Sequence, residues 1–246
     1  MKIFRWIYTI WAALVFLFAA LIGVFWFTLS SLLPRRTAVG AMISYNVCWS
    51  KFFAFLTGSS YRVYGREKLQ KEGAYIFACN HTGSGDIFIT NIALRRPFCP
   101  LGKAEARKIP IIGYVFSKVM VFVDRSNPES RRKSLVELAK VVEQGISVLI
   151  FPEGTRNRTG NPPLLPFKSG AFRLAIEAQI PLVPMVITGV RDLLPNERPP
   201  LRPAAMSAYF GDPIETKGMT EQDINALKEQ AYKVMNDLLL KYEQQK

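Results

Sequence analysis

The sequence predicts an α/β fold with one mostly parallel sheet flanked by helices, preceded by an N-terminal hydrophobic helix or helix pair. Three observations predict it. From Tyr61 onward, short apolar runs alternate with longer amphipathic segments, as expected where helices connect buried parallel strands. The 246 residues suffice for one sizeable core, and no repeat of about 20 to 50 residues indicates a solenoid. The chain also begins with one long apolar run.

That run lies between Arg5 and Arg35, where no side chain is charged. It exceeds the roughly 20 apolar residues that cross a bilayer, and its Trp and Tyr residues cluster near the two ends. A signal peptide would have a shorter apolar region and a cleavage site of small residues, whereas Pro34-Arg35-Arg36 follows here. We therefore expect a retained anchor. Positive charges flank both ends, so crossing the bilayer and entering one leaflet both stay open.

The segment from Ala38 to Leu56 has apolar residues at helical spacing and few charges. It predicts a helix that lies along the membrane or packs against the domain. The predicted strands are short apolar runs bounded by turn residues or charges. They are Tyr75–Cys79, Met120–Val123, Val148–Phe151, Leu182–Ile187 and, as an edge strand, Met206–Phe210. The predicted later helices are Ser130–Glu143, Ser169–Ala178 and a last one with Thr220 as N-cap.

Lys and Arg outnumber Asp and Glu by 32 to 19, which gives a formal net charge of +13. Such a surface attracts nucleic acid, an anionic leaflet or a phosphorylated substrate. The basic residues form no long run and accompany no nucleic-acid motif, so we expect no nucleic-acid partner. Three cysteines and one histidine offer no ready zinc ligand set, and we expect no metal. Cys79 is a candidate thiol nucleophile, although a small apolar residue buried in a strand is favoured.

His81 and Asp86 are the candidate catalytic pair. The strand ending at Cys79 delivers His81 to its carboxyl end, and Gly83 and Gly85 permit a tight turn before a helix opens at Asp86. The carboxylate can then fold back onto the imidazole, fix its tautomer and stabilise the imidazolium. A serine hydrolase would use the same histidine differently, but the chain contains no GxSxG elbow. The hydroxyl that His81 activates is therefore predicted to belong to the substrate.

Two further groups are candidate binding residues. Glu153, Gly154, Thr155 and Arg156 directly follow a predicted strand, and a guanidinium, a hydroxyl and backbone N–H groups around a glycine make a phosphate cradle. A charged turn with Glu–Arg pairing is the alternative. Lys103 and Arg125 add positive charge near two other strand ends, where solvated surface charge is an equal alternative.

These blocks resemble the 1-acyl-glycerol-3-phosphate acyltransferase family, the glycerolipid acyltransferases marked by an HxxxxD motif. Asn80-His81 to Asp86 resembles the first block, and Phe151-Pro-Glu-Gly-Thr-Arg156 resembles the third. The second block is matched by Lys103-Ala-Glu, Ile109-Pro with Gly113, and Phe122-Val-Asp-Arg125. Ile180-Pro-Leu-Val-Pro184 resembles the fourth. The likeness runs from about Tyr61 to Phe210 in the family's order. Many members have Ser and a bulky residue where this chain has Gly83 and Gly85, which concerns the shape of the acceptor or acyl pocket.

The resemblance implies an enzyme that acylates the sn-2 hydroxyl of lysophosphatidic acid, with acyl-CoA or acyl-carrier protein as donor, giving phosphatidic acid. His81 is implied as base, Asp86 as its support, and Arg156, Arg125 and Lys103 as ligands of the anionic head, without a cofactor. Residues 1–58 are expected to form a membrane anchor with an interfacial helix, and 59–246 the acyltransferase domain. Membrane lipids are then partners, and the catalytic domain is expected on the cytoplasmic side of the inner membrane.

Two alternatives stay open. Another lysolipid, such as a lyso-ornithine lipid or a different lysophospholipid, can be the acceptor. A membrane-anchored protein that binds lipid or nucleic acid without catalysis is the hypothesis from another class, and it predicts no turnover.

Overall fold

A computed structural model describes residues 2–108, 117, 119–124, 126–195 and 198–243. In this part of the chain, seven strands form one sheet with the order β1-β7-β6-β2-β5-β3-β4. Neighbouring strands are parallel except β6 and β7, which pair antiparallel. The strands are β1 Ser60–Tyr64, β2 Ile76–Cys79, β3 Phe98–Lys103, β4 Val121–Val123, β5 Ser147–Ile150, β6 Leu182–Thr188 and β7 Ala205–Phe210.

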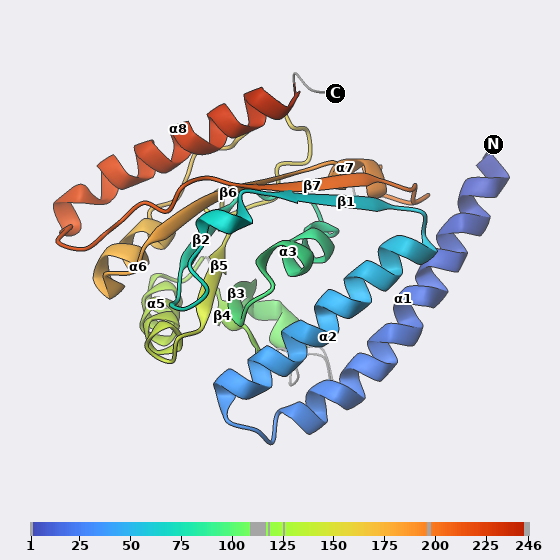
Figure 1. The fold of residues 1–246 in the computed structure, drawn as a ribbon, viewed down its shortest axis with the longest axis horizontal. Helices are drawn as coiled ribbons and strands as arrows, with labels where there is room; N and C mark the ends of the chain where they lie inside the picture. The colour runs from blue at the N-terminus through green and yellow to red at the C-terminus, as the bar shows by residue number, and fades with distance from the viewer. Residues whose placement is uncertain (1, 109–116, 118, 125, 196–197, 244–246) are drawn as a thin grey trace.

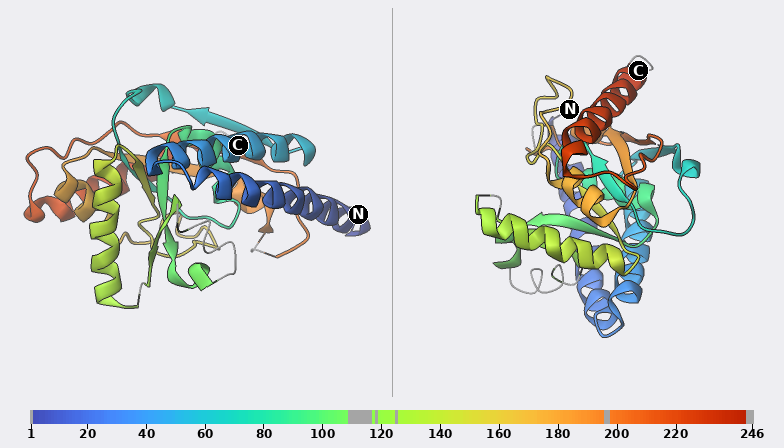
Figure 2. Two further views of the ribbon diagram at one scale, coloured as in Figure 1. Left: turned by 90° about the horizontal axis from the view of Figure 1, so that it is seen from below. Right: turned by 90° about the vertical axis from the view of Figure 1, so that its left-hand side faces the viewer.

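Helices cover both faces of the sheet (Figures 1 and 2). On one face α2 and α3 contact each other and the sheet, while α5, α6 and α8 pack on the other. The helices are α1 Lys2–Ser30, α2 Arg35–Leu56, α3 Asp86–Leu94, α5 Pro128–Glu143, α6 Gly170–Ala178, α7 Val190–Leu193 and α8 Ile224–Glu243. Short 3₁₀ turns occur at Arg66–Lys68, Ala104–Lys108 and Glu221–Asp223. The predicted α/β architecture is confirmed.

The central strands are apolar throughout because both of their faces are covered. Every residue of β2 and β5 is buried, and Phe77 is fully enclosed between the two helical layers. Local signals also act as expected at two helix ends. Asn127 caps α5 by accepting the N–H groups of Glu129 and Ser130, and Thr220 forms a capping box with Asp223 ahead of α8.

The sheet differs from the prediction at its rims. Met206–Phe210 was expected at an edge, but β7 lies inside because β1 pairs with it residue for residue. β1 alternates exposed and half-buried residues, so it lacks the continuous apolar run of a central strand. β3 begins with buried Phe98 and Cys99 but continues through Pro100 and Gly102, two residues that weaken a strand signal. Both strands were therefore missed in the sequence.

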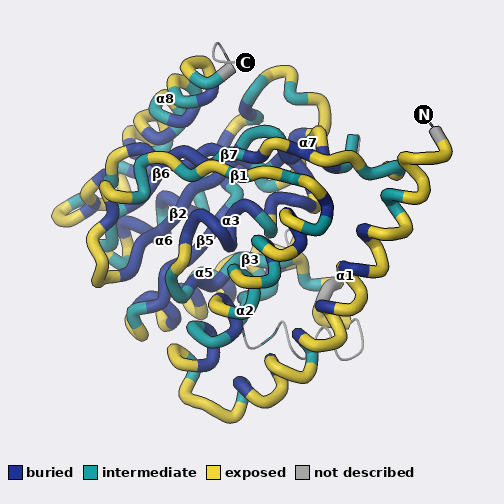
Figure 3. Tube along the Cα trace, turned by 45° about the vertical axis from the view of Figure 1, so that its right-hand side comes forward, coloured by how far each residue is buried: buried dark blue, intermediate teal, exposed yellow. Residues whose placement is uncertain are grey.

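The N-terminal segment is a pair of antiparallel helices along one side of the molecule (Figures 1 and 3). Small residues of α1, Ala12 and Ala19 among them, are buried against α2. Tyr45 of α2 donates its hydroxyl to the carbonyl of Ala19 at 2.6 Å. Most of the large apolar residues of α1 face outward instead. They are Ile3, Phe4, Trp6, Ile7, Ile10, Trp11, Leu14, Phe16, Leu17, Phe18, Leu21, Ile22, Phe25, Trp26 and Leu29.

By length and composition, residues Ile3–Ser30 could cross a membrane. The second helix is not a free membrane element, since Val39 and Ile43 of α2 join the main core and α2 contacts α3 and β3. Of the two expected positions for the segment from Ala38 to Leu56, packing against the domain is the one observed. The predicted boundary at residue 58 falls in the turn between α2 and β1, and the division into two domains stays a prediction.

Candidate active site

The predicted site residues come together at one edge of the sheet. Strands β2, β5, β3 and β6 are parallel, so their carboxyl ends point the same way. His81 follows β2, Glu153 follows β5, and Lys103 ends β3. This is the edge where ligands bind in open α/β sheets.

His81 and Asp86 meet as expected. The Nδ1 atom of His81 lies 2.6 Å from Oδ2 of Asp86, the first residue of α3. The imidazole is 16% exposed and the carboxylate 3% exposed, so the ring's outer part reaches the surface while its partner is enclosed. The His81 ring also stacks on Phe151, with centroids 4.1 Å apart and planes inclined by 18°. Two neighbours thus fix the ring plane.

Asp86 is held by the turn that precedes it. Oδ2 also accepts the N–H of Thr82 at 2.8 Å, and Oδ1 accepts the Thr82 hydroxyl at 2.5 Å and the N–H of Gly83 at 3.1 Å. These donors stabilise a buried negative charge and set the carboxylate's orientation. With Nδ1 bound to Asp86, the nitrogen left for proton transfer is Nε2.

Gly85 explains how the turn fits. A Cβ atom on Gly85 would lie 2.9 Å from Cγ1 of Val190 and 3.1 Å from Cδ2 of Leu193, both on α7. The short helix α7 therefore packs directly on the turn between His81 and Asp86. This contact leaves little room for a side chain at position 85.

Glu153 has a different place from the one expected. It is 3% exposed, and its two carboxylate oxygens accept the N–H groups of His81 at 2.7 Å and Leu165 at 2.9 Å. Burial raises the pKa of the Glu153 carboxyl, while these backbone donors, His81 and Arg191 oppose that rise. The geometry favours a positioning role, in which Glu153 joins the loop after β5 to the backbone of His81, over the predicted contact with the substrate.

Gly154, Thr155 and Arg156 follow at the surface. Gly154 has φ +72°, a conformation that favours glycine, and its N–H closes a turn onto the carbonyl of Phe151 at 3.0 Å. Thr155 and Arg156 are exposed beside it. The structure thus places an exposed guanidinium on a loop that is fastened to the His81 backbone, and its predicted contact with a phosphate stays a prediction.

The structure gives less support for a binding role of Lys103 and Arg125. Lys103 is exposed at the end of β3 and pairs with Glu105 at 2.9 Å. Strand β5 separates its strand from that of His81, and no contact between Lys103 and His81 is among those of the described residues. Arg125 lies outside the described residues, as do Ile109, Pro110 and Gly113 of the second block. The structure leaves the roles of both side chains as predictions.

Three polar residues of the site were not singled out in the sequence. Buried Asn80 accepts the N–H of Ile187 at 2.7 Å and donates to its carbonyl at 3.0 Å, which ties β2 to β6 beside His81. Buried Asn157 donates its N–H to the carbonyl of His81 at 2.7 Å. Arg191 binds the carbonyl of Asn157. Adjacency to the motifs was a signal for the two asparagines, whereas nothing local distinguished Arg191.

The thiol alternative does not fit this geometry. Cys79 is fully buried, and burial raises the pKa of its thiol well above the ordinary value, with the charges of Asp86 and Glu153 adding to the rise. A thiol held neutral inside the sheet is a poor nucleophile. Cys79 therefore acts as a small buried residue, the favoured interpretation of its position in a strand.

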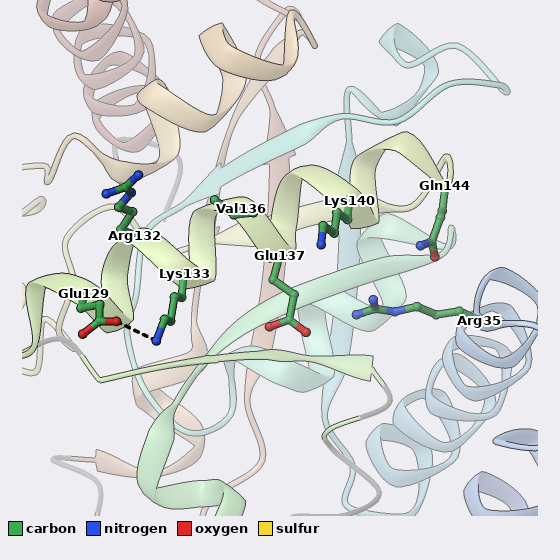
Figure 4. Close-up of a pocket in the computed structure, with 8 residues that line it drawn as sticks. All are labelled: Arg35, Glu129, Arg132, Lys133, Val136, Glu137, Lys140 and Gln144. Carbon is green, nitrogen blue, oxygen red and sulfur yellow. Dashed lines mark ion pairs between the residues drawn. The ribbon is translucent and has the colours of Figure 1, made fainter.

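A groove of about 500 Å³ lies elsewhere, along α5 and the start of α2 (Figure 4). None of the predicted site residues lines it. Its walls carry charges of both signs, including a Glu129–Lys133 pair at 2.7 Å. The lining residues are Arg35, Glu129, Arg132, Lys133, Val136, Glu137, Lys140 and Gln144. This balance of charges is that of a solvated helix face.

Comparisons with known proteins agree with the motifs. A family model described as Acyltransferase matches residues 60–188. A 1-acyl-sn-glycerol-3-phosphate acyltransferase from Cocos nucifera is 32% identical over 198 residues, which cover 79% of this chain and 63% of that protein. A putative 1-acyl-sn-glycerol-3-phosphate acyltransferase from Caenorhabditis elegans is 34% identical over 191 residues, covering 76% and 65%. The matched part is thus less than two thirds of either relative's length.

A solved structure has the same fold. The crystal structure of a 1-acyl-sn-glycerophosphate acyltransferase from Thermotoga maritima superposes with a TM-score of 0.78 at 23% sequence identity. The match covers 97% of this chain and 98% of the other, so it includes the N-terminal helix pair.

Proposed function

The chain belongs to the Acyltransferase family, and on that premise we propose that it acylates the free sn-2 hydroxyl of 1-acyl-glycerol-3-phosphate. The donor is acyl-CoA or acyl-carrier protein, and the product is phosphatidic acid for phospholipid biosynthesis. One observation carries the proposal: a buried, fully bonded Asp86 holds Nδ1 of a surface-reaching His81 at 2.6 Å. The relatives named as 1-acyl-sn-glycerol-3-phosphate acyltransferases support this choice of acceptor.

The proposed chemistry is a single acyl transfer. Nε2 of His81 removes the proton of the acceptor hydroxyl as the oxygen attacks the thioester carbonyl carbon. The new C–O bond forms, the C–S bond breaks, and the imidazolium returns its proton to the departing thiolate. Asp86 stabilises the imidazolium between these two steps, because its charge is already fixed 2.6 Å from Nδ1. Each group needed is a side chain of the protein, so we propose that no metal or cofactor takes part.

The acceptor's phosphate is proposed to bind at Arg156, with Arg125 and Lys103 contributing positive charge. A guanidinium can bind a phosphate through two parallel hydrogen bonds. Arg156 fits this role because Glu153 and Asn157, on either side of it, bind the two backbone groups of His81. A phosphate on Arg156 is thereby kept at a fixed position relative to the base.

Arg156→Ala is expected to raise the KM for lysophosphatidic acid about tenfold or more, since a charge-assisted hydrogen bond of about 1.5–3 kcal/mol is lost. The KM for the acyl donor should change less than twofold. Initial rates measured while each substrate is varied give both values. Arg132→Ala on α5 is the matched control, and a larger rise in the donor KM would contradict the phosphate role.

The function itself is tested with membranes that contain the wild-type protein. Labelled acyl-CoA and acyl-carrier protein are each offered with lysophosphatidic acid, other lysophospholipids and a lyso-ornithine lipid. Labelled phosphatidic acid is the expected product, unchanged in amount by EDTA. Turnover restricted to the phosphate-free acceptor would overturn the substrate, and no turnover with any acceptor would favour a binding protein.

The helix pair is proposed to hold the enzyme at the membrane. The exposed apolar side chains of α1 continue along the helix from Ile3 to Leu29, a surface that water disfavours and lipid accepts. We place the catalytic domain on the cytoplasmic side of the inner membrane, where the thioester donors are available. Protease digestion of sealed vesicles of both orientations tests this: cleavage of the domain only in right-side-out vesicles would contradict it.

A further inference from the structure

Arg191 lies outside the sequence motifs but hydrogen-bonds to the loop that carries Arg156. It lies on α7, which directly follows β6 at the carboxyl edge of the sheet. Its Nε and Nη2 atoms both donate to the carbonyl oxygen of Asn157, at 3.1 and 2.9 Å. Gly160 packs against the guanidinium so closely that a Cβ there would lie 2.5 Å from Nη1. The side chain is therefore clamped by the loop that follows β5.

Asn157 links Arg191 to His81, the proposed base. Its backbone N–H donates to the carbonyl of His81 at 2.7 Å. Its side-chain amide donates to the carbonyls of Pro162 and Pro163, at 2.7 and 3.2 Å, and accepts the N–H of Gly160 at 2.9 Å. With Asn157 only 2% exposed, these bonds organise the loop from the inside.

The segment Gly154 to Arg156 therefore lies between two residues that hydrogen-bond to the backbone of His81. Glu153 binds the N–H of His81 on one side, and Asn157 binds its carbonyl on the other. The side chain of Glu153 accepts two backbone N–H groups, from His81 and Leu165, and the charge of Arg191 also acts on this carboxyl. Asn157 depends on Arg191 directly, because its carbonyl accepts both guanidinium donors.

We infer that Arg191 is a positioning residue that holds Asn157, and with it the Arg156 loop, in register with His81. This inference rests on the proposed function, because it concerns where the acceptor's anionic head sits relative to the base. It adds to that function a residue that touches neither the acceptor nor the reacting atoms.

The hydrogen bonds of Arg191 differ from those that orient the His81 imidazole for proton transfer. Asp86 orients the imidazole through Nδ1, and its carboxylate accepts hydrogen bonds from Thr82 and Gly83 of its own turn. Loss of Arg191 should therefore disturb the acceptor site more than proton transfer. Arg191 binds the Asn157 carbonyl through two planar donors, whereas a lysine would offer a single ammonium group at this position.

The test compares Arg191→Ala and Arg191→Lys with the surface control Arg132→Ala. Arg191→Ala is expected to raise the acceptor KM about tenfold, the effect of losing a charge-assisted hydrogen bond, with kcat lowered less than threefold and the donor KM unchanged. Arg191→Lys should lie between Arg191→Ala and wild type, and millimolar guanidinium should lower the acceptor KM of Arg191→Ala alone. An unchanged acceptor KM, or a fall in kcat without a change in KM, overturns the inference.

A second measurement needs no substrate. Hydrogen exchange of backbone amides in residues 154–160 should speed up at least tenfold in Arg191→Ala, while exchange in β2 and α3 stays as in the wild type. Unchanged exchange in 154–160, or equally faster exchange throughout the domain, overturns the role. If the wild-type protein fails to acylate lysophosphatidic acid, the proposed function is wrong, and the exchange result still decides whether Arg191 positions the loop.

Discussion

His81→Ala is expected to lower kcat about 10³-fold or more, with little change in either KM. A positioned general base contributes about 10²–10⁴-fold to a rate. The imidazole stacks on Phe151, binds Asp86 through Nδ1 and is 16% exposed, so its other nitrogen can act on a substrate hydroxyl. Label transfer from acyl-CoA to lysophosphatidic acid in matched membrane preparations measures the change.

Cys79→Ala is the matched control for this loss. It removes a buried side chain at the end of β2, two residues before His81, so it reports general damage to the site without changing the imidazole. Its kcat should stay within about threefold of wild type. If Cys79→Ala lost as much activity as His81→Ala, the loss in His81→Ala could not be assigned to the imidazole, and the proposed role of His81 as the base would fail.

Asp86→Asn is expected to lower kcat by about 10³-fold and to destabilise the fold by about 1–3 kcal/mol. The amide of Asn would direct hydrogens at some of the four donors that now converge on the carboxylate, from Thr82, Gly83 and the His81 ring. The imidazole would also lose the partner that sets its tautomer and stabilises its charged form. Rate assays and thermal unfolding in detergent report the two effects separately.

Asp237→Asn on the exposed side of α8 is the control for the loss of one carboxylate charge. It should leave kcat unchanged and shift stability by less than about 0.5 kcal/mol. A wild-type rate in Asp86→Asn would show that His81 works without an ionic partner, and the pair would lose its assigned role.

The sequence was informative where a signal is local. Continuous apolar runs predicted the central strands, because a strand enclosed on both faces has no polar side. Gly83 and Gly85 predicted the turn, and the turn brought Asp86 back onto His81 as expected. A motif along the chain thus predicted the contact between His81 and Asp86.

What escaped prediction depends on partners distant in the chain. β1 has no continuous apolar run, and its pairing with β7 joins residues 145 positions apart, from Ser60 to Ala205. From the sequence, Glu153 was predicted to belong to a phosphate-binding loop. It is buried instead, and the N–H groups of His81 and Leu165 satisfy its carboxylate. Arg191 is recruited by a carbonyl 34 residues earlier, a contact that no periodicity encodes.

Gly85 carries a consequence for reading substitutions between relatives. Val190 and Leu193 of α7 pack on the backbone of Gly85, so the size of residue 85 and the position of α7 depend on each other. A larger residue grafted here alone would displace Val190 and so move Arg191, its neighbour. Exchanges between homologous enzymes at this place are therefore meaningful only as a matched set, with the turn and the short helix transplanted together.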